Sequence, residues 1–163
     1  MTIERYSVGF TRSGPPLASG EAYAELLAGA SDPVSIKSIT VTTGSNLGGH
    51  VALAHSSAIG TGAATGIFTG VAHRLVATSP TGPARAQVAW TSSGVSPTGY
   101  VSRLRDQVLP IATGQTRTLW DSSIDGSLVV EPSKSLLVLN QGTGTVGSGA
   151  DLRINFTWEE GRL

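Results

Sequence analysis

The C-terminal segment 151–159, D-L-R-I-N-F-T-W-E, alternates strictly between polar and apolar side chains. The apolar members of this alternation are Leu152, Ile154, Phe156 and Trp158. Because successive side chains of a β-strand point to opposite sides, the pattern predicts a strand with one buried and one wet face. Such a strand is typical of an antiparallel sheet. A shift of its pairing by one residue would expose all four apolar side chains, so the register is firmly specified.

Similar patterns predict further short strands, separated by turns rich in Gly and Pro. They lie at 4–11, 34–43, 51–53, 85–91, 101–109, 116–120, 127–131 and 136–139. In 34–43 the alternation changes phase across Lys37-Ser38, and a β-bulge there would keep the apolar residues on one face. Two abutting short strands are the alternative. The segment 136–139, L-L-V-L, lacks alternation, which predicts a central strand that is covered on both faces.

Two segments depart from the strand pattern. In residues 20–29, G-E-A-Y-A-E-L-L-A-G, the apolar side chains Tyr23, Leu26 and Leu27 recur at helical spacing, which predicts one short helix. Residues 55–83 are rich in Gly, Ala, Ser and Thr, and we expect a loop or arm there that contacts a partner.

Short strands, frequent turns and one helix predict an all-β fold, an antiparallel β-sandwich of the jelly-roll type. An immunoglobulin-type sandwich is the alternative. The length of 163 residues suits a single domain, 1–163, that carries the arm at 55–83.

The chain carries little charge. Only 13% of the residues are charged, against about 25% in an average soluble protein, and the formal net charge is zero. Weak self-repulsion favours association, so we expect a component of an assembly; a polar, uncharged surface is the plainer interpretation. Nucleic-acid binding needs a net basic face, and Arg103 and Arg105 are followed at once by Asp106, so no nucleic-acid partner is expected.

The sequence predicts neither a disulfide framework nor a thiolate metal site, because it contains no cysteine. It shows no signal-peptide pattern and no apolar run near the length of about 20 residues that spans a bilayer, so no membrane partner is expected. These features favour assembly in a reducing cytoplasm.

Two motifs imitate metal sites. The histidines are His50, His55 and His73, and the first two lie five residues apart, on opposite faces of a continuous strand. The segment Asp121–Gly126 resembles the start of a calcium loop, but the twelfth position, which should be a glutamate, is Pro132, with Glu131 one residue early. We therefore expect no metal, and a tight turn at Asp121–Gly126.

No catalytic motif is recognised. Glu159 and Glu160 are neighbours in the chain and face opposite sides of a strand, so they cannot share a proton as catalytic dyads do. No nucleophile elbow, P-loop or dinucleotide fingerprint is present. The sequence predicts a protein that is not an enzyme and has no catalytic, cofactor or metal residues.

The tryptophans could form a platform for sugars. Trp90 and Trp158 share parity with apolar neighbours, which favours core packing, whereas Trp120 lies beside a turn and could be exposed.

Several segments together resemble small jelly-roll virion proteins of tailed bacteriophages, of the head-decoration or minor capsid type. These segments are E-A-Y-A-E-L-L-A, S-I-K-S-I-T-V-T, G-S-L-V-V-E-P-S-K-S-L-L-V-L-N-Q and L-R-I-N-F-T-W-E-E. The resemblance covers most of the chain except 55–83.

The resemblance implies a structural role in a virion assembled in the host cytoplasm. It also implies a homo-oligomer, with a trimer favoured, that contacts the major capsid protein or other virion proteins. A β-sandwich module that binds glycans, as part of a phage tail or host-recognition apparatus, is the alternative function.

Overall fold

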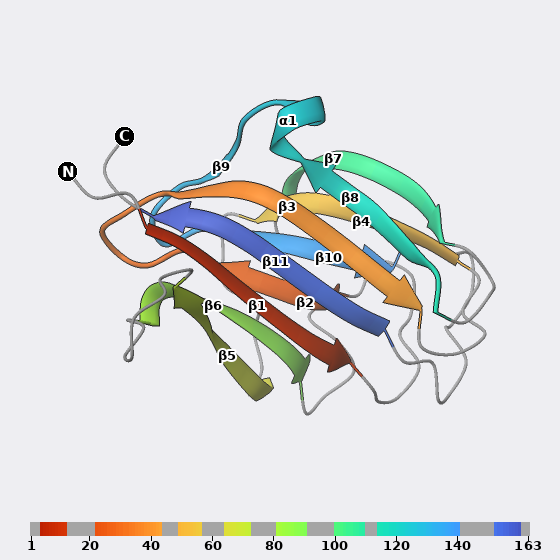
Figure 1. The fold of residues 1–163 in the computed structure, drawn as a ribbon, viewed down its shortest axis with the longest axis horizontal. Helices are drawn as coiled ribbons and strands as arrows, with labels where there is room; N and C mark the ends of the chain where they lie inside the picture. The colour runs from red at the N-terminus through yellow and green to blue at the C-terminus, as the bar shows by residue number, and fades with distance from the viewer. Residues whose placement is uncertain are drawn as a thin grey trace.

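The computed structural model describes residues 4–12, 22–43, 49–56, 64–72, 81–90, 100–109, 114–140 and 152–160, and it is an all-β, antiparallel sandwich. The described residues form eleven strands and one short helix (Figure 1). The strands are β1 (Glu4–Arg12), β2 (Ala22–Leu27), β3 (Val34–Thr43), β4 (Gly49–Ser56), β5 (Ala64–Ala72), β6 (Thr81–Trp90), β7 (Tyr100–Leu109), β8 (Thr116–Asp121), β9 (Leu128–Val130), β10 (Ser135–Asn140) and β11 (Leu152–Glu160). The helix, α1, spans Ser122–Asp125.

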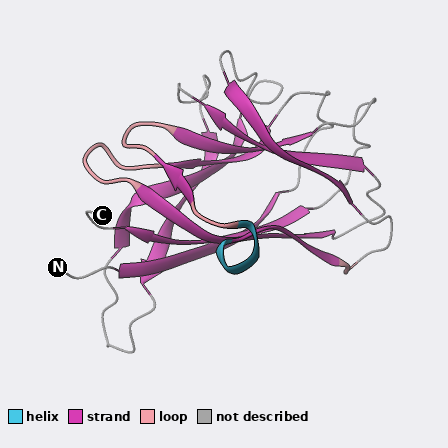
Figure 2. Cartoon of the chain, turned by 90° about the horizontal axis from the view of Figure 1, so that it is seen from above, coloured by secondary structure: helices cyan, strands magenta, loops and turns pink. Residues whose placement is uncertain are grey.

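The strands follow one hydrogen-bonded path that folds over into two layers. The order is β7-β4-β10-β2-β6-β5-β1-β11-β3-β8, and β9, off this path, pairs with the first residues of β3. Figure 1 shows β1, β11, β3 and β8 in front of β2, β10, β4 and β7, while β5 and β6 join the two layers along one edge. Figure 2 shows the same two layers from above. The jelly-roll version of the sandwich stays a prediction.

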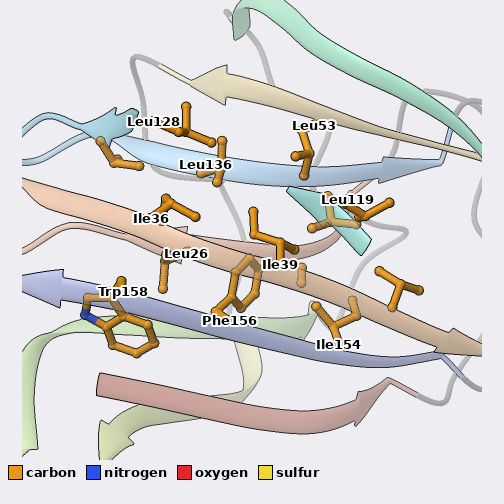
Figure 3. Packing of buried hydrophobic residues seen from close by; sticks show 14 of the residues in the cluster. Leu26, Ile36, Ile39, Leu53, Leu119, Leu128, Leu136, Ile154, Phe156 and Trp158 are labelled. Atoms are coloured by element: carbon orange, nitrogen blue, oxygen red, sulfur yellow. The ribbon is translucent and has the colours of Figure 1, made fainter. Parts of the chain in front are cut away.

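The main core lies between the layers, and β11 contributes its largest side chains. Leu152, Ile154, Phe156 and Trp158 are all fully buried, as the alternation predicts (Figure 3). Burial of each such side chain contributes about 1.5–3 kcal/mol. The tyrosine ring of Tyr6 on β1 stacks on Trp158, with ring centroids 6.0 Å apart.

The predicted bulge in β3 is confirmed. Ser38 pairs with Thr157 and Ile36 with Trp158, so Lys37 is the extra residue. The bulge lets Val34, Ile36, Ile39 and Val41 all face the core in one continuous strand, because it resets the phase of the alternation. The alternative of two abutting strands is therefore wrong.

The predicted helix at 20–29 is wrong for Ala22–Leu27, which form strand β2 between β10 and β6. All six residues are buried, including Glu25, because this layer is covered on both faces. A strand buried on both sides shows no alternation, and its Ala, Glu and Leu residues are strong helix formers. Pairing with two neighbouring strands overrides that local preference.

The lack of alternation in the segment 136–139, L-L-V-L, has the same cause, because it lies in β10, next to β2 in the same layer. In β10, Leu136 and Val138 belong to the main core, whereas Leu137 and Leu139 belong to a second buried cluster with Ala22, Ala52 and Ala54 on the opposite face. The prediction of a central strand that is covered on both faces is confirmed.

The predicted loop or arm at 55–83 is wrong where the structure describes it. Ala64–Ala72 form β5, which pairs with both β1 and β6, and β6 begins at Thr81. The glycines in β5 hid its strand character, since Gly is depleted in strands. Residues 57–63 and 73–80 lie outside the described residues.

Candidate functional site

The outer face of the front layer is wet and held by local polar contacts. On it, the carboxylate of Glu159 accepts hydrogen bonds from Arg5 Nε at 3.2 Å and Arg5 Nη2 at 2.6 Å, and forms an ion pair with Lys37 Nζ at 2.8 Å. The hydrogen bond from Lys37 is the main cause that lowers the pKa of Glu159, and Arg5 lowers it further. Glu159 on β11 thus joins two cationic side chains, one from each neighbouring strand.

Hydroxyl and amide side chains link the remaining strands of that face. The hydroxyls of Thr42 and Thr116 lie 2.7 Å apart, and Asn155 Nδ2 donates to Thr40 Oγ1 at 3.2 Å. The side chain of Asn155 covers Gly9, where a Cβ would collide with its Oδ1. These contacts join β11 to β3 and β3 to β8 across the outer face of the front layer.

The calcium-like segment Asp121–Gly126 contains the short helix α1. Asp121 caps this helix, because its Oδ1 accepts from the backbone N–H of Ser123 at 2.9 Å and from the Ser123 hydroxyl at 2.6 Å. The same bonds lower the pKa of Asp121. Asp125 Oδ2 accepts the backbone N–H of Asp121 at 2.8 Å. Both carboxylates therefore stabilise the tight turn that the sequence predicts.

The histidines do not form a cluster in the described part of the chain. His55 is half-buried on β4, opposite the core residue Leu136, and burial lowers its pKa while the charge of Glu131 acts in the other direction. The side chain of His50 and the whole of His73 lie outside the described residues. No group of three potential metal ligands occurs among the described side chains.

The tryptophans differ in their surroundings. Trp158 is fully buried, which confirms its predicted role in the core. Trp120, for which the sequence left exposure beside a turn open, packs against the core and is only partly exposed. The side chain of Trp90 lies outside the described residues. Only part of the Trp120 side chain is therefore accessible from outside.

Glu160, at the end of β11, carries a buried carboxyl group. The residue is only 7% exposed, and its Oε1 accepts the indole N–H of Trp158 at 2.6 Å and the backbone N–H of Ala84 at 3.1 Å. Its Oε2 is buried and has no hydrogen-bond partner among the described residues. We call Glu160, Trp158, Ala84, Tyr6 and Glu4 the Glu160 corner.

Burial is the main cause that raises the pKa of Glu160, and the charge of Asp32 adds to it, while the two N–H donors act in the opposite direction. Burial and the charge of Glu160 together raise the pKa of Tyr6. Glu4 pairs with Glu160 across β1 and β11, a position that brings cross-strand Cβ atoms to about 5 Å. Burial and like charge therefore act in the same direction on the pKa values of Glu160 and Tyr6.

The sequence located part of this site. The expectation that Glu159 and Glu160 face opposite sides is confirmed, since Glu159 lies on the wet face and Glu160 is buried. Glu160 continues the parity of the four apolar residues of β11, and this signal could have placed it in the core. The sequence alone could not show that Glu4 and Ala84 lie beside Glu160, because both are far from Glu160 in the chain.

Comparison of the chain with protein-family models, with curated proteins and with solved structures gives no match. Among the described residues, no helix has the length and apolar character needed to cross a membrane.

Proposed function

We propose that this protein is a non-enzymatic structural component of a bacteriophage particle, a capsid decoration or minor capsid protein. It assembles with copies of itself, a trimer being favoured, and with the major capsid protein or other virion proteins. The resemblance of its segments to small jelly-roll virion proteins supports this proposal, and the jelly-roll version of the sandwich belongs to it.

The observation that carries the proposal is the edge of β8. This strand ends the sheet path, and within the described residues it hydrogen-bonds to β3 alone. Its first three residues, Thr116, Arg117 and Thr118, are exposed. An unpaired strand edge is a template for another chain, and symmetric oligomers cover such edges with a repeated contact.

The perturbed side chains fit a structural role. Glu159 is engaged in ion pairs, Asp121 caps α1, and Glu160 links two strands. The zero net charge and the low fraction of charged residues favour close packing of many copies.

The test is sedimentation velocity of the wild-type protein and two matched variants. Thr118→Lys places a charge on the edge strand β8, whereas Thr157→Lys places it on the wet face of β11, where Thr157 pairs with Ser7 of β1 and Ser38 of β3. We expect a discrete wild-type oligomer that Thr118→Lys dissociates and Thr157→Lys leaves intact. A wild-type monomer up to high micromolar concentration would refute the assembly role, and loss of the oligomer only in Thr157→Lys would refute the edge as the contact.

Glycan binding remains the alternative function. The partial burial of Trp120 leaves less of its ring for a sugar to stack on and weakens this alternative. A glycan-array signal that Trp120→Ala abolishes, from a protein that shows no self-association, would favour it.

A further inference from the structure

The Glu160 corner joins two strands that are not neighbours in the sheet. β11 belongs to the front layer, and β6 is separated from it by β5 and β1 in the strand order. The hydrogen bond from the backbone N–H of Ala84 to Glu160 Oε1 therefore crosses the edge where the path folds from one layer to the other. No backbone ladder makes that connection.

An irregularity in β6 makes the N–H of Ala84 available. The pairing of β5 with β6 shifts between Thr69, opposite Arg85, and Val71, opposite Thr81, so residues 82–84 of β6 face the single residue Gly70. The pairing of β2 with β6 reaches only as far as Arg85. Ala84 thus lies outside both ladders. Its backbone N–H donates a hydrogen bond to the carboxyl group of Glu160 instead of to a neighbouring strand.

The electrostatic surroundings of Glu160 disfavour its charge. The titratable groups that face it in the described structure are Glu4 and Tyr6 on β1 and Asp32 before β3, and none of these is cationic. On β3, its register partner is the apolar Val34. Burial therefore removes water from a negative charge on Glu160, and the charge of Asp32 repels it. Only the N–H groups of Trp158 and Ala84 favour the ionised form.

We propose that Glu160 is a proton-operated latch between β11 and β6, which holds the folded corner of the sandwich when it is protonated and weakens it when it is ionised. In the protonated form, Oε1 still accepts the N–H groups of Trp158 and Ala84, and no charge is buried. In the ionised form, opening of the corner lets water solvate the carboxylate.

The direction of the pH effect follows from proton linkage. The pKa of Glu160 is raised in the folded state, so the folded protein holds this proton more tightly than the unfolded chain does. The contribution of Glu160 to stability is greatest at acidic pH and declines as pH rises from the ordinary glutamate value of 4.5 through the raised value.

The test compares urea unfolding midpoints of the wild type, Glu160→Gln and Glu159→Gln between pH 4 and pH 8. Glutamine keeps an oxygen for both N–H donors and cannot ionise. We expect Glu160→Gln to have the higher midpoint at neutral pH, with the advantage disappearing near pH 4. Glu159→Gln, the adjacent control on the wet face, should lose stability relative to the wild type at neutral pH. Parallel profiles for the wild type and Glu160→Gln would overturn the latch.

A second measurement covers the case in which Glu160→Gln does not fold. In the wild-type protein with ¹³C-labelled glutamate, we expect the carboxyl signal of Glu160 to titrate at higher pH than that of Glu159. Above that midpoint, hydrogen-exchange protection of the Ala84 amide should fall by up to about tenfold per pH unit, beyond the intrinsic rate. A Glu160 carboxyl that titrates at or below Glu159 would refute the proposal, whatever the oligomeric state of the protein.

Discussion

At Gly9, the outer face of β1 is covered by a side chain from the neighbouring strand. Asn155 lies over the glycine and is tied to Thr40 by a hydrogen bond. A strand residue without a Cβ loses packing and costs conformational entropy. Its use here is explained by the close approach of Asn155 Oδ1, which leaves no room for a methyl group.

We predict that Gly9 and Asn155 are energetically coupled. Gly9→Ala should stabilise the Asn155→Ala variant by about 0.5–1 kcal/mol, because alanine is favoured over glycine in a strand interior. In the wild type, the methyl group displaces Asn155 from Thr40 and should cancel that gain, which gives a coupling of about 1 kcal/mol. A double-mutant cycle by urea denaturation measures this value, and additive effects would refute the contact.

Residues Glu159 and Glu160 illustrate how adjacent side chains in a strand acquire opposite properties. The pKa of Glu159 is lowered by Lys37 and Arg5, and that of Glu160 is raised by burial. The folded state thus releases the Glu159 proton more readily than the unfolded chain. Its contribution is present above the ordinary glutamate value of 4.5 and is lost as pH falls through the lowered value.

We predict that Glu159→Gln costs about 0.2–1 kcal/mol at pH 7, a range typical of ion pairs near the surface. The cost should shrink as pH falls below 4.5 and should also shrink in high salt, which screens the pair. Urea denaturation at several pH values, with and without 1 M NaCl, checks this prediction. A cost that grows on acidification would contradict the assignment of the ion pairs.

At the scale of elements, strands with one wet face were the predictable ones. The alternation of β11 and the phase change in β3 predicted both the strands and the bulge, because each has a dry and a wet side. β2 was misassigned since both of its sides are dry and its residues favour helix. The glycines of β5 concealed its strand pattern. The helix α1 has only four residues and is stabilised by the Asp121 cap, so it is too short to show a helical periodicity in the sequence.

The two faces of β11 should respond very differently to truncation. Phe156→Ala removes a fully buried ring and should cost about 3–5 kcal/mol, whereas Thr157→Ala, on the opposite face, should cost no more than about 1 kcal/mol. Thermal or urea unfolding of the two variants measures the difference. Similar costs at the two positions would contradict the register of β11 between β1 and β3.

At the scale of the whole molecule, the two layers differ in what they can offer a partner. The layer that contains β4, β10 and β2 is buried on both sides, with an apolar cluster on each. The front layer has a wet outer face and ends at β8, which among the described strands pairs with β3 alone. This asymmetry depends on contacts between segments far apart in the sequence, so alternation within single segments could not reveal it.

In the proposed assembly, another copy of the chain covers the edge of β8. Amide hydrogen exchange at low and high protein concentration tests this claim residue by residue. We predict that protection of the β8 amides, Thr116–Trp120, rises with concentration while protection of β11 in the interior of the sheet stays constant. Exchange of the β8 amides that is the same at every concentration would contradict it.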